Sequence, residues 1–176
     1  MTIELPPKLR IIEIGAVCSI AEYERCVLVV WRQQPTRAAF DQRHRILTEL
    51  AARHPRTCAY VEVIESTSTP PTNELRKVAV EVFRKLGSDL GCVGFVLDGT
   101  ELRTTMVRAI LTTMTFFVPQ MQPSKVFKRL SDVPAFIHSH IGETGFDQRT
   151  FVAAFDQLRR TVAMPVASES ESRPST

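Results

Sequence analysis

A run of hydroxyl side chains lies between a strand-like segment and a helix-like segment of the chain. The run consists of Ser66, Thr67, Ser68 and Thr69, and two prolines follow it. Such residues are typical of helix capping, because Thr is a good N-cap and Pro is favoured in the first helical turn. The same position, after a strand and before a helix, also attracts ligands and anions in open α/β sheets. Capping is the simpler interpretation, and an interaction or phosphorylation site is the alternative.

A second polar group follows the next strand-like segment. It consists of Asp98, Thr100, Arg103 and Thr104. In a parallel sheet this edge lies beside the hydroxyl run, so we expect one polar rim made from both groups. The rim holds an acid and alcohols but no histidine close in sequence, and an alcohol nucleophile needs an activating base. An Asp-Gly turn with a capping Thr is the simpler interpretation here.

Neither the histidines nor the cysteines have the spacing of a metal site. His138 and His140 are two positions apart, so on a helix they point to different sides, whereas zinc-binding helices use a spacing of three or four. No C-x-x-C pattern, Gly-rich phosphate loop or G-x-S-x-G turn occurs. We therefore expect no enzyme, no metal and no cofactor. The cysteines, which we expect to be reduced and buried in strands, are Cys18, Cys26, Cys58 and Cys92.

Composition is consistent with a single cytoplasmic domain. The chain has 176 residues, a net charge of +3 and 44% hydrophobic residues, which suits one folded unit. We find no signal peptide, and no apolar run reaches the roughly 18–20 residues of a membrane helix. The most basic stretch alternates in sign every four residues, which predicts ion pairs along one helix face rather than a nucleic-acid site. That series is Arg37, Asp41, Arg45, Glu49 and Arg53.

Hydrophobic periodicity and turn residues predict strands that alternate with helices. The order β-β-α-β-α-β-α-β-α, plus an extra C-terminal helix, requires crossover connections. We therefore expect an α/β fold with a mostly parallel, four- to five-stranded sheet that starts with a β-hairpin. The predicted strands are 11–20, 26–33, 57–65, 91–98 and the edge strand 124–129; the predicted helices are 36–53, 72–86, 102–118, 131–141 and one that begins at 144–147.

The ends of the chain differ from its centre. We expect an irregular lead-in over 1–10, the α/β domain over 11–141, an additional amphipathic helix over 142–164 and a disordered tail over 165–176. The apolar stripe of the additional helix includes Phe151, Phe155 and Leu158. It either packs on the chain's own sheet or forms a homodimer surface, and we favour packing because amphipathic helices usually cover their own core.

Over roughly residues 10–141 the element order and lengths resemble the STAS domain, the SpoIIAA-like fold of bacterial anti-sigma-factor antagonists, and the related STAS/Sec14-type domains. The segments with the matching cadence are Phe-Val-Leu-Asp-Gly-Thr (95–100), Lys-Val-Phe (125–127) and Ser-Asp-Val-Pro-Ala-Phe-Ile (131–137). The resemblance implies a phosphorylatable hydroxyl in the loop after the third predicted strand, at Ser66 or Thr67. A Pro-Pro pair stands where such antagonists carry a small Gly-containing motif.

We therefore expect a non-enzymatic bacterial regulatory or scaffolding domain. It would act through protein–protein contact around the loop 66–69 and the predicted helix after Asp98, with phosphorylation of that loop as a switch. The alternative is a small-ligand or lipid-binding domain of the STAS/Sec14 type, with a cleft between the sheet and helix 102–118. We expect a protein partner, with a homo-oligomer as a further option, and neither nucleic acid nor a membrane span.

Overall fold

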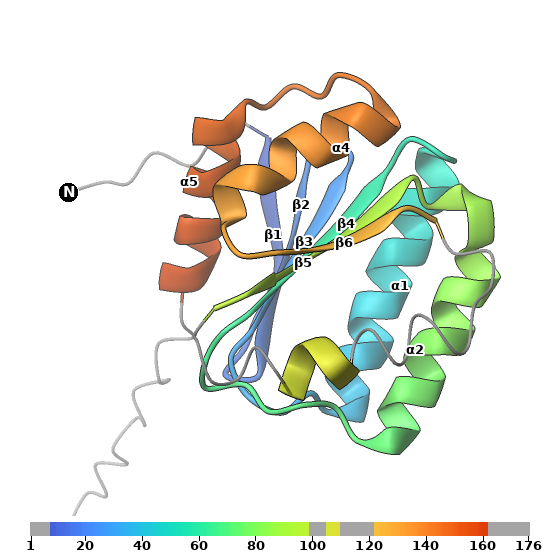
Figure 1. Cartoon of the computed structure of the whole chain (residues 1–176), viewed down its shortest axis with the longest axis vertical. Coiled ribbons are helices and arrows are strands. Elements are labelled where there is room, and N and C mark those ends of the chain that lie inside the picture. Colours follow the sequence, from blue (N-terminus) through green and yellow to red (C-terminus); the bar gives the residue numbers. More distant parts are fainter. Residues whose placement is uncertain (1–7, 99–104, 110–121, 162–176) are drawn as a thin grey trace, which may run out of the picture.

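The computed structural model describes residues 8–98, 105–109 and 122–161. Its centre is a six-stranded sheet in which the spatial order of the strands equals their order in the chain (Figure 1). The first three strands are antiparallel, and the last four run parallel. The strands are β1 (Leu9–Ile14), β2 (Cys18–Tyr23), β3 (Cys26–Trp31), β4 (Ala59–Ile64), β5 (Cys92–Leu97) and β6 (Ser124–Phe127).

The prediction of four to five strands was wrong, because the sheet has six. The segment predicted as one strand over 11–20 divides at Gly15, whose amide donates to the carbonyl of Cys18 at 2.9 Å and closes a turn. The sheet consequently starts with two successive hairpins rather than one. Its first strand also begins at Leu9, inside the predicted lead-in, because β1 pairs with β2 from Leu9 onward.

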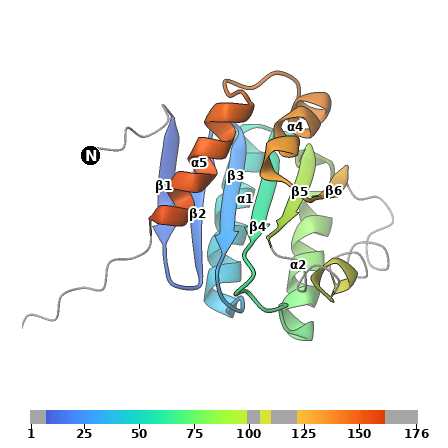
Figure 2. The same cartoon turned by 60° about the vertical axis from the view of Figure 1, so that its left-hand side comes forward.

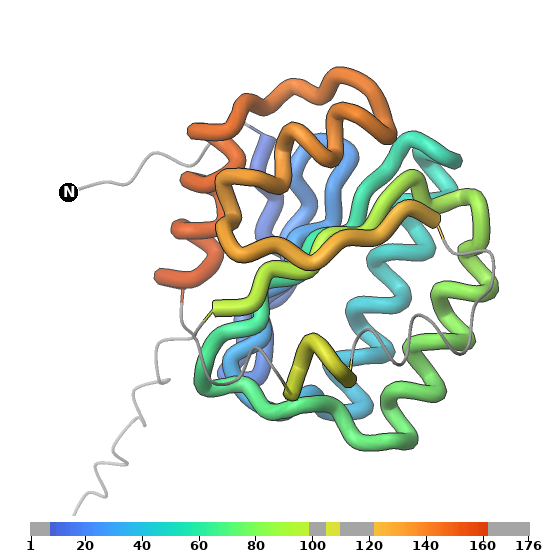
Figure 3. The backbone as a smooth tube through the Cα atoms, in the orientation of Figure 1, coloured from blue at the N-terminus to red at the C-terminus, as the bar shows by residue number. Residues whose placement is uncertain are grey.

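Helices cover both faces of the sheet (Figures 1 and 2). The helices α1 (Arg37–Arg53) and α2 (Asn73–Leu86) lie on one face, and α4 (Val133–Ile141) and α5 (Gln148–Arg160) lie on the other. Two short 3-10 turns, η1 (Gly87–Asp89) and η2 (Leu130–Asp132), complete the described elements. The tube in Figure 3 follows the chain from α4 to α5 on this face; α4 packs on β5, and α5 packs on β2 and β3.

Local residues explain where the helices begin. The Thr36 hydroxyl accepts from the Ala39 amide at 3.2 Å, and the Thr72 hydroxyl accepts from the Leu75 amide at 3.3 Å. Asp147 and Thr150 form a reciprocal capping box at the start of α5. The predicted starts of α1, α2 and α5 and the edge position of the last strand are thus confirmed, whereas α4 begins at Val133, two residues later than predicted. Of the predicted helix 102–118, residues 105–109 are helical and the remainder lies outside the described residues, as does the predicted tail.

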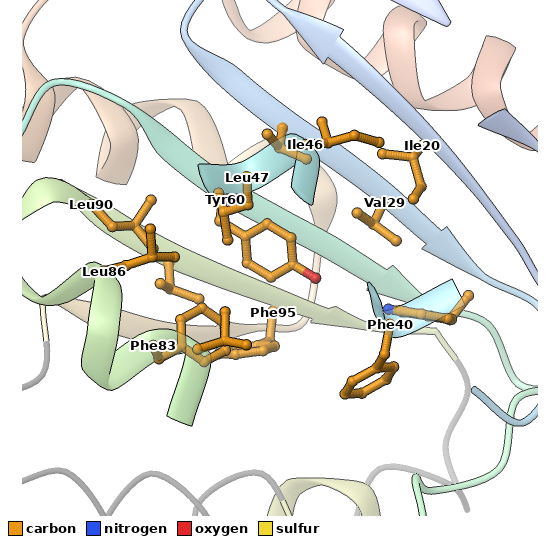
Figure 4. Close-up of a cluster of buried hydrophobic side chains, with 14 of the residues drawn as sticks. Ile20, Val29, Phe40, Ile46, Leu47, Tyr60, Phe83, Leu86, Leu90 and Phe95 are labelled. Atoms are coloured by element: carbon orange, nitrogen blue, oxygen red, sulfur yellow. The ribbon is translucent and has the colours of Figure 1, made fainter. Parts of the chain in front are cut away.

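Two hydrophobic cores lie on opposite faces of the sheet. The first contains side chains of α1 and α2 with Met106, and includes Tyr60, Phe83 and Phe95 (Figure 4). The second contains side chains of α4 and α5. Alternate residues of the central strands point into each core, which is why β3, β4 and β5 are buried along their whole length.

The apolar stripe of the last helix packs against the chain's own sheet. Phe151, Phe155 and Leu158 are 0% exposed within a single chain. They belong to the core on the α5 face, where the Phe151 and Phe155 rings meet edge to face at 5.4 Å. Because the chain's own sheet covers these side chains, they offer no surface to a second copy.

The predicted series of ion pairs on α1 forms only in part. Arg37 pairs with Asp41 at 3.0 Å as expected. Arg45 instead donates to the Gln42 side chain at 3.0 Å. Arg53 reaches β2 and pairs with Glu22 at 2.5 Å. A buried carboxylate on the neighbouring strand is a stronger partner than an exposed one on the same helix, since water screens the latter.

Candidate functional site

Charged residues follow three adjacent parallel strands at their carboxyl ends. Arg32 follows β3, Glu65 follows β4 and Asp98 follows β5. The strand ends are in register, with Trp31 beside Ile64 and Ile64 beside Leu97. This edge is where open α/β sheets usually hold their ligands. We call Arg32, Glu65, Asp98 and the α5 residue Arg159 the carboxyl-edge cluster.

Arg159 joins the two acids of this cluster. Its Nη2 lies 3.3 Å from Asp98 Oδ2, and its Nε lies 3.8 Å from Glu65 Oε1. The Arg159 side chain is 28% exposed, and that of Asp98 is 57% exposed. A guanidinium shared by two carboxylates at this depth ties the end of α5 to the ends of β4 and β5. The exposed part of the Asp98 side chain remains available for contact with another molecule.

Arg32 holds the last turn of α5 from the other side. Its guanidinium donates to the carbonyls of Leu158 at 2.9 Å and Arg159 at 3.1 Å, and to the Ser19 hydroxyl at 2.7 Å. The final carbonyls of a helix lack partners within the helix and carry its negative dipole end, so a cation there is stabilising. Arg32 therefore fixes the position from which Arg159 reaches the two acids.

The hydroxyl loop lies directly beside this cluster, and its four members differ. The Thr67 hydroxyl donates to the Arg32 carbonyl at 2.7 Å, and the Ser68 hydroxyl donates to the Gln33 carbonyl at 2.9 Å. Ser68 is only 1% exposed, so its hydroxyl is structural rather than accessible. Ser66 and Thr69 are exposed, and no hydrogen bond joins their side chains to a described residue.

The structure thus brings together part of the predicted rim. Asp98 and Glu65, the residue before Ser66, both pair with Arg159, so Asp98 lies close to the start of the loop. The predicted rim residues Thr100, Arg103 and Thr104 lie outside the described residues. The cap of α2 is Thr72 rather than any hydroxyl of the loop 66–69.

Arg32 and Arg159 were not among the site residues predicted from the sequence. A usable signal existed for Arg32, because it is the first charged residue after a strand that is apolar throughout. No comparable signal existed for Arg159, because its role depends on where α5 crosses the sheet.

A second polar cluster is buried on the α1/α2 face. Glu62 Oε2 accepts from Trp31 Nε1 at 2.8 Å and from the Tyr60 hydroxyl. Arg43 Nη1 donates to the Tyr60 oxygen at 3.3 Å and lies 3.8 Å from Glu62 Oε2. The Arg43 guanidinium also lies over the Phe40 ring, 4.3 Å from its centre. We call Trp31, Arg43, Tyr60 and Glu62 the buried arginine cluster.

Arg43 is 2% exposed, and its Nε and Nη2 have no hydrogen-bond partner among the residues that the structure describes. Burial lowers the pKa of Arg43, but Tyr60 and Glu62 outweigh burial, so the pKa is raised and the guanidinium stays charged. Burial also holds the pKa of Tyr60 well above its usual range. This cluster was not predicted from the sequence. Its signals were Glu62 within a buried strand and the position of Arg43 three residues after Phe40, on the apolar face of the helix.

The cysteines and histidines are placed as structural residues. All four cysteines are free and buried. Burial raises the pKa of Cys18 to about 11 and that of Cys92 to about 12, so both remain thiols near neutral pH. His138 Nε2 lies 2.7 Å from the Thr144 hydroxyl, and His140 Nδ1 lies 2.8 Å from the Phe136 carbonyl. The described residues contain no group of three or more side chains suited to a metal ion.

An open pocket of about 360 Å³ lies between the β1–β2 turn and the first turn of α1. Its lining includes Glu13, Cys18, Thr36 and Gln42. The Gln42 amide lies 3.5 Å from Glu13 Oε2, so the polar groups of the wall face one another. Within the described residues, no helix is both long enough and apolar enough to cross a membrane.

Comparison with known proteins gives one similarity of structure. No family model matches the chain, and no curated protein matches its sequence. The chain is similar to the crystal structure of an uncharacterized protein of the DUF3478 family with a SpoIIAA-like fold from Shewanella loihica PV-4. The two share 14% identity and a TM-score of 0.48 over 78% of this chain and 98% of that one.

Proposed function

We propose that this protein is a non-enzymatic interaction domain whose recognition surface is the loop 66–69 beside the carboxyl-edge cluster. One observation carries the proposal: Ser66 and Thr69 are exposed on a loop whose backbone is held in place by Thr67 and Ser68. A surface that is fixed before binding loses little entropy when a partner docks. The proposal keeps the bacterial cytoplasmic setting expected from the sequence.

Phosphorylation of Ser66 would change this surface through charge. A phosphate adds roughly −1.5 to −2 charges. Ser66 is adjacent in the chain to Glu65, which already shares Arg159 with Asp98. The added charge repels the two carboxylates and competes for the guanidinium. The modified loop therefore presents a different pattern of charge to a partner.

Variants confined to Ser66 and Thr69 test this function, because the hydroxyls of Thr67 and Ser68 hold the loop itself. Quantitative affinity capture from the native host would compare the wild-type chain with Ser66→Asp and Thr69→Asp. Ser139→Asp is the matched control, since Ser139 is an exposed serine on α4. We expect Ser66→Asp to change recovery of specific partners by about tenfold or more and Ser139→Asp to leave it unchanged.

An identical set of partners for all three variants would contradict the proposal. The switch would be refuted separately if phosphopeptide mapping of the protein from its host found residues 66–69 unmodified. A double variant, Ser66→Ala with Thr69→Ala, that bound every partner at wild-type strength would argue against recognition by these hydroxyls.

The second candidate function is binding of a small ligand on the α1/α2 face, and a different observation favours it. Arg43 is buried and charged, yet two of its nitrogens lack a partner among the described residues. Buried polar groups in native proteins are nearly always hydrogen-bonded, so such a group calls for a missing acceptor. Met106 places the helical residues 105–109 against the same core.

A further inference from the structure

We propose that the buried Arg43 guanidinium is the anchor for a small carboxylate with an apolar body, bound on the α1/α2 face of the sheet. The inference rests on the second proposed function, ligand binding, and names its site and the chemical class of the ligand. It is independent of the recognition surface at the loop 66–69.

The geometry of the guanidinium identifies the group that it would bind. Arg43 Nη1 is occupied by the Tyr60 oxygen at 3.3 Å and by Glu62 at 3.8 Å. The two nitrogens without a described partner are Nε and Nη2. These two nitrogens form one edge of the planar guanidinium, with parallel N–H bonds. That edge matches a carboxylate or phosphate group, which accepts both hydrogen bonds at once.

Glu62 does not fill this role. Its Oε2 accepts from Trp31 Nε1 and from the Tyr60 hydroxyl, and it approaches Arg43 on the Nη1 side. Tyr60 and Glu62 therefore orient Arg43 from the Nη1 side, and the opposite edge has no partner among the described residues. A guanidinium held in this way loses little conformational freedom on binding, which favours affinity.

The surroundings set the character of the rest of the ligand. The Arg43 guanidinium lies 4.3 Å from the centre of the Phe40 ring and 5.8 Å from that of Phe83. Figure 4 shows the hydroxyl end of Tyr60 directed toward Phe40, with Phe83 and Phe95 gathered on the other side of the Tyr60 ring. Met106 is 2% exposed in the same core. The described side chains that face the guanidinium apart from Tyr60 and Glu62 are aromatic or apolar, which suits a ligand with an apolar body.

Charge favours a carboxylate over a phosphate. Arg43 is the positive member of the buried arginine cluster, and Glu62 already neutralises part of its charge. A dianionic phosphate would bring two negative charges into an apolar core with one shared cation, and burying uncompensated charge is costly. A monoanionic carboxylate brings one negative charge rather than two to the Arg43–Glu62 pair, so it leaves less uncompensated charge buried.

Octanoate is a suitable probe, with 1-octanol as the uncharged control of equal chain length. Calorimetric titration would use the full chain, together with Arg43→Lys and the control Arg45→Lys. Lys keeps the charge but loses the two-pronged edge. Arg45 is an exposed arginine on the same helix. We expect octanoate to bind the wild type and Arg45→Lys alike, and to bind Arg43→Lys about ten- to a hundredfold more weakly.

A measurement on the unaltered protein covers the case in which Arg43→Lys fails to fold. The side-chain Nε–H signal of Arg43 in a ¹⁵N-edited NMR spectrum reports directly on the free edge. We expect this signal to shift on titration with octanoate and to stay in place with 1-octanol.

The possible outcomes distinguish a wrong assignment of Arg43 from a failure of the ligand-binding proposal as a whole. If octanoate binds while the Arg43 signal stays in place and Arg43→Lys binds equally well, the assignment of Arg43 is overturned and ligand binding elsewhere stands. Equal binding of 1-octanol and octanoate also overturns the carboxylate assignment. If neither probe binds the wild-type chain, both the site and the second proposed function are overturned.

Discussion

The packing of Phe155 gives a direct test of whether α5 belongs to the core or forms an interface. Phe155 is 0% exposed and contacts the Phe151 ring within the core on the α5 face. Replacing a fully buried Phe by Ala removes apolar contacts and leaves a cavity, at a cost of about 3–5 kcal/mol. Small domains have a free energy of unfolding of about 5–15 kcal/mol in total, so Phe155→Ala removes a large share of it.

Thermal unfolding followed by circular dichroism would measure this change. For a chain of this length, each 1 kcal/mol lowers Tm by roughly 2–4 °C, so we expect a drop of about 6–20 °C. Val152→Ala is the matched control, because Val152 lies on the same helix and is only partly buried. We expect the control to cost less than about 1 kcal/mol.

Light scattering at two protein concentrations would accompany the unfolding experiments. The reasoning is refuted if Phe155→Ala costs less than about 1 kcal/mol and changes the oligomeric state instead, since the ring would then lie in an interface between chains. A large loss of stability with no change of mass supports the structure described above.

Further predictions concern packing and titration. Gly91→Ala should lower the free energy of unfolding measured in urea by about 1–3 kcal/mol, because an added Cβ would lie 2.7 Å from the Arg56 carbonyl and overlap Ile141. Since burial raises the pKa of Cys18 to about 11 and of Cys92 to about 12, a thiol reagent at pH 8 should modify the native cysteines slowly and all four rapidly in denaturant; fast reaction of the native protein would contradict their burial. The Thr150 amide lowers the pKa of Asp147, so the capping contribution is present above the ordinary Asp range and is lost as the pH falls through the lowered value; Asp147→Ala should therefore show a smaller acid-side loss of Tm than the wild type. Burial, and then Arg43, lower the pKa of His44 from 6.5, so stability falls as the pH drops below 6.5, and His44→Gln should flatten the dependence of Tm on pH in that range.

Most of the α1/α2 side of the fold followed from local signals. Thr36 and Thr72 begin their helices as capping residues, and Gly87 ends α2 with a φ of 47°, which a glycine adopts without strain. The apolar runs at β3 and β5 showed buried strands. The first hairpins were harder, because the turn at Gly15 lies inside a run of residues that favour strands.

Only part of the candidate site could be predicted from the sequence. The loop 66–69 and Asp98 each follow an apolar run, so their place at the carboxyl edge could be predicted from the parallel topology. Arg159 is 61 residues from Asp98 in the chain, and nothing local indicates that the two meet. The accessible and the structural hydroxyls of the loop could not be told apart either, because the bonds from Thr67 and Ser68 go to the backbone after β3.

The sequence by itself determined the class of fold, the limits of α1 and α2 and the burial of the cysteines, because capping, periodicity and composition act over a few residues. Tertiary structure alone decided three other features. These are the packing of the apolar side chains of α5 on the chain's own sheet, the two carboxylates that pair with Arg159, and the groups that surround the buried Arg43 guanidinium. Those outcomes depend on how distant segments cross the sheet. A cation's partners are set by what surrounds it in space, and for Arg43 those partners come from β4 as well as from its own helix.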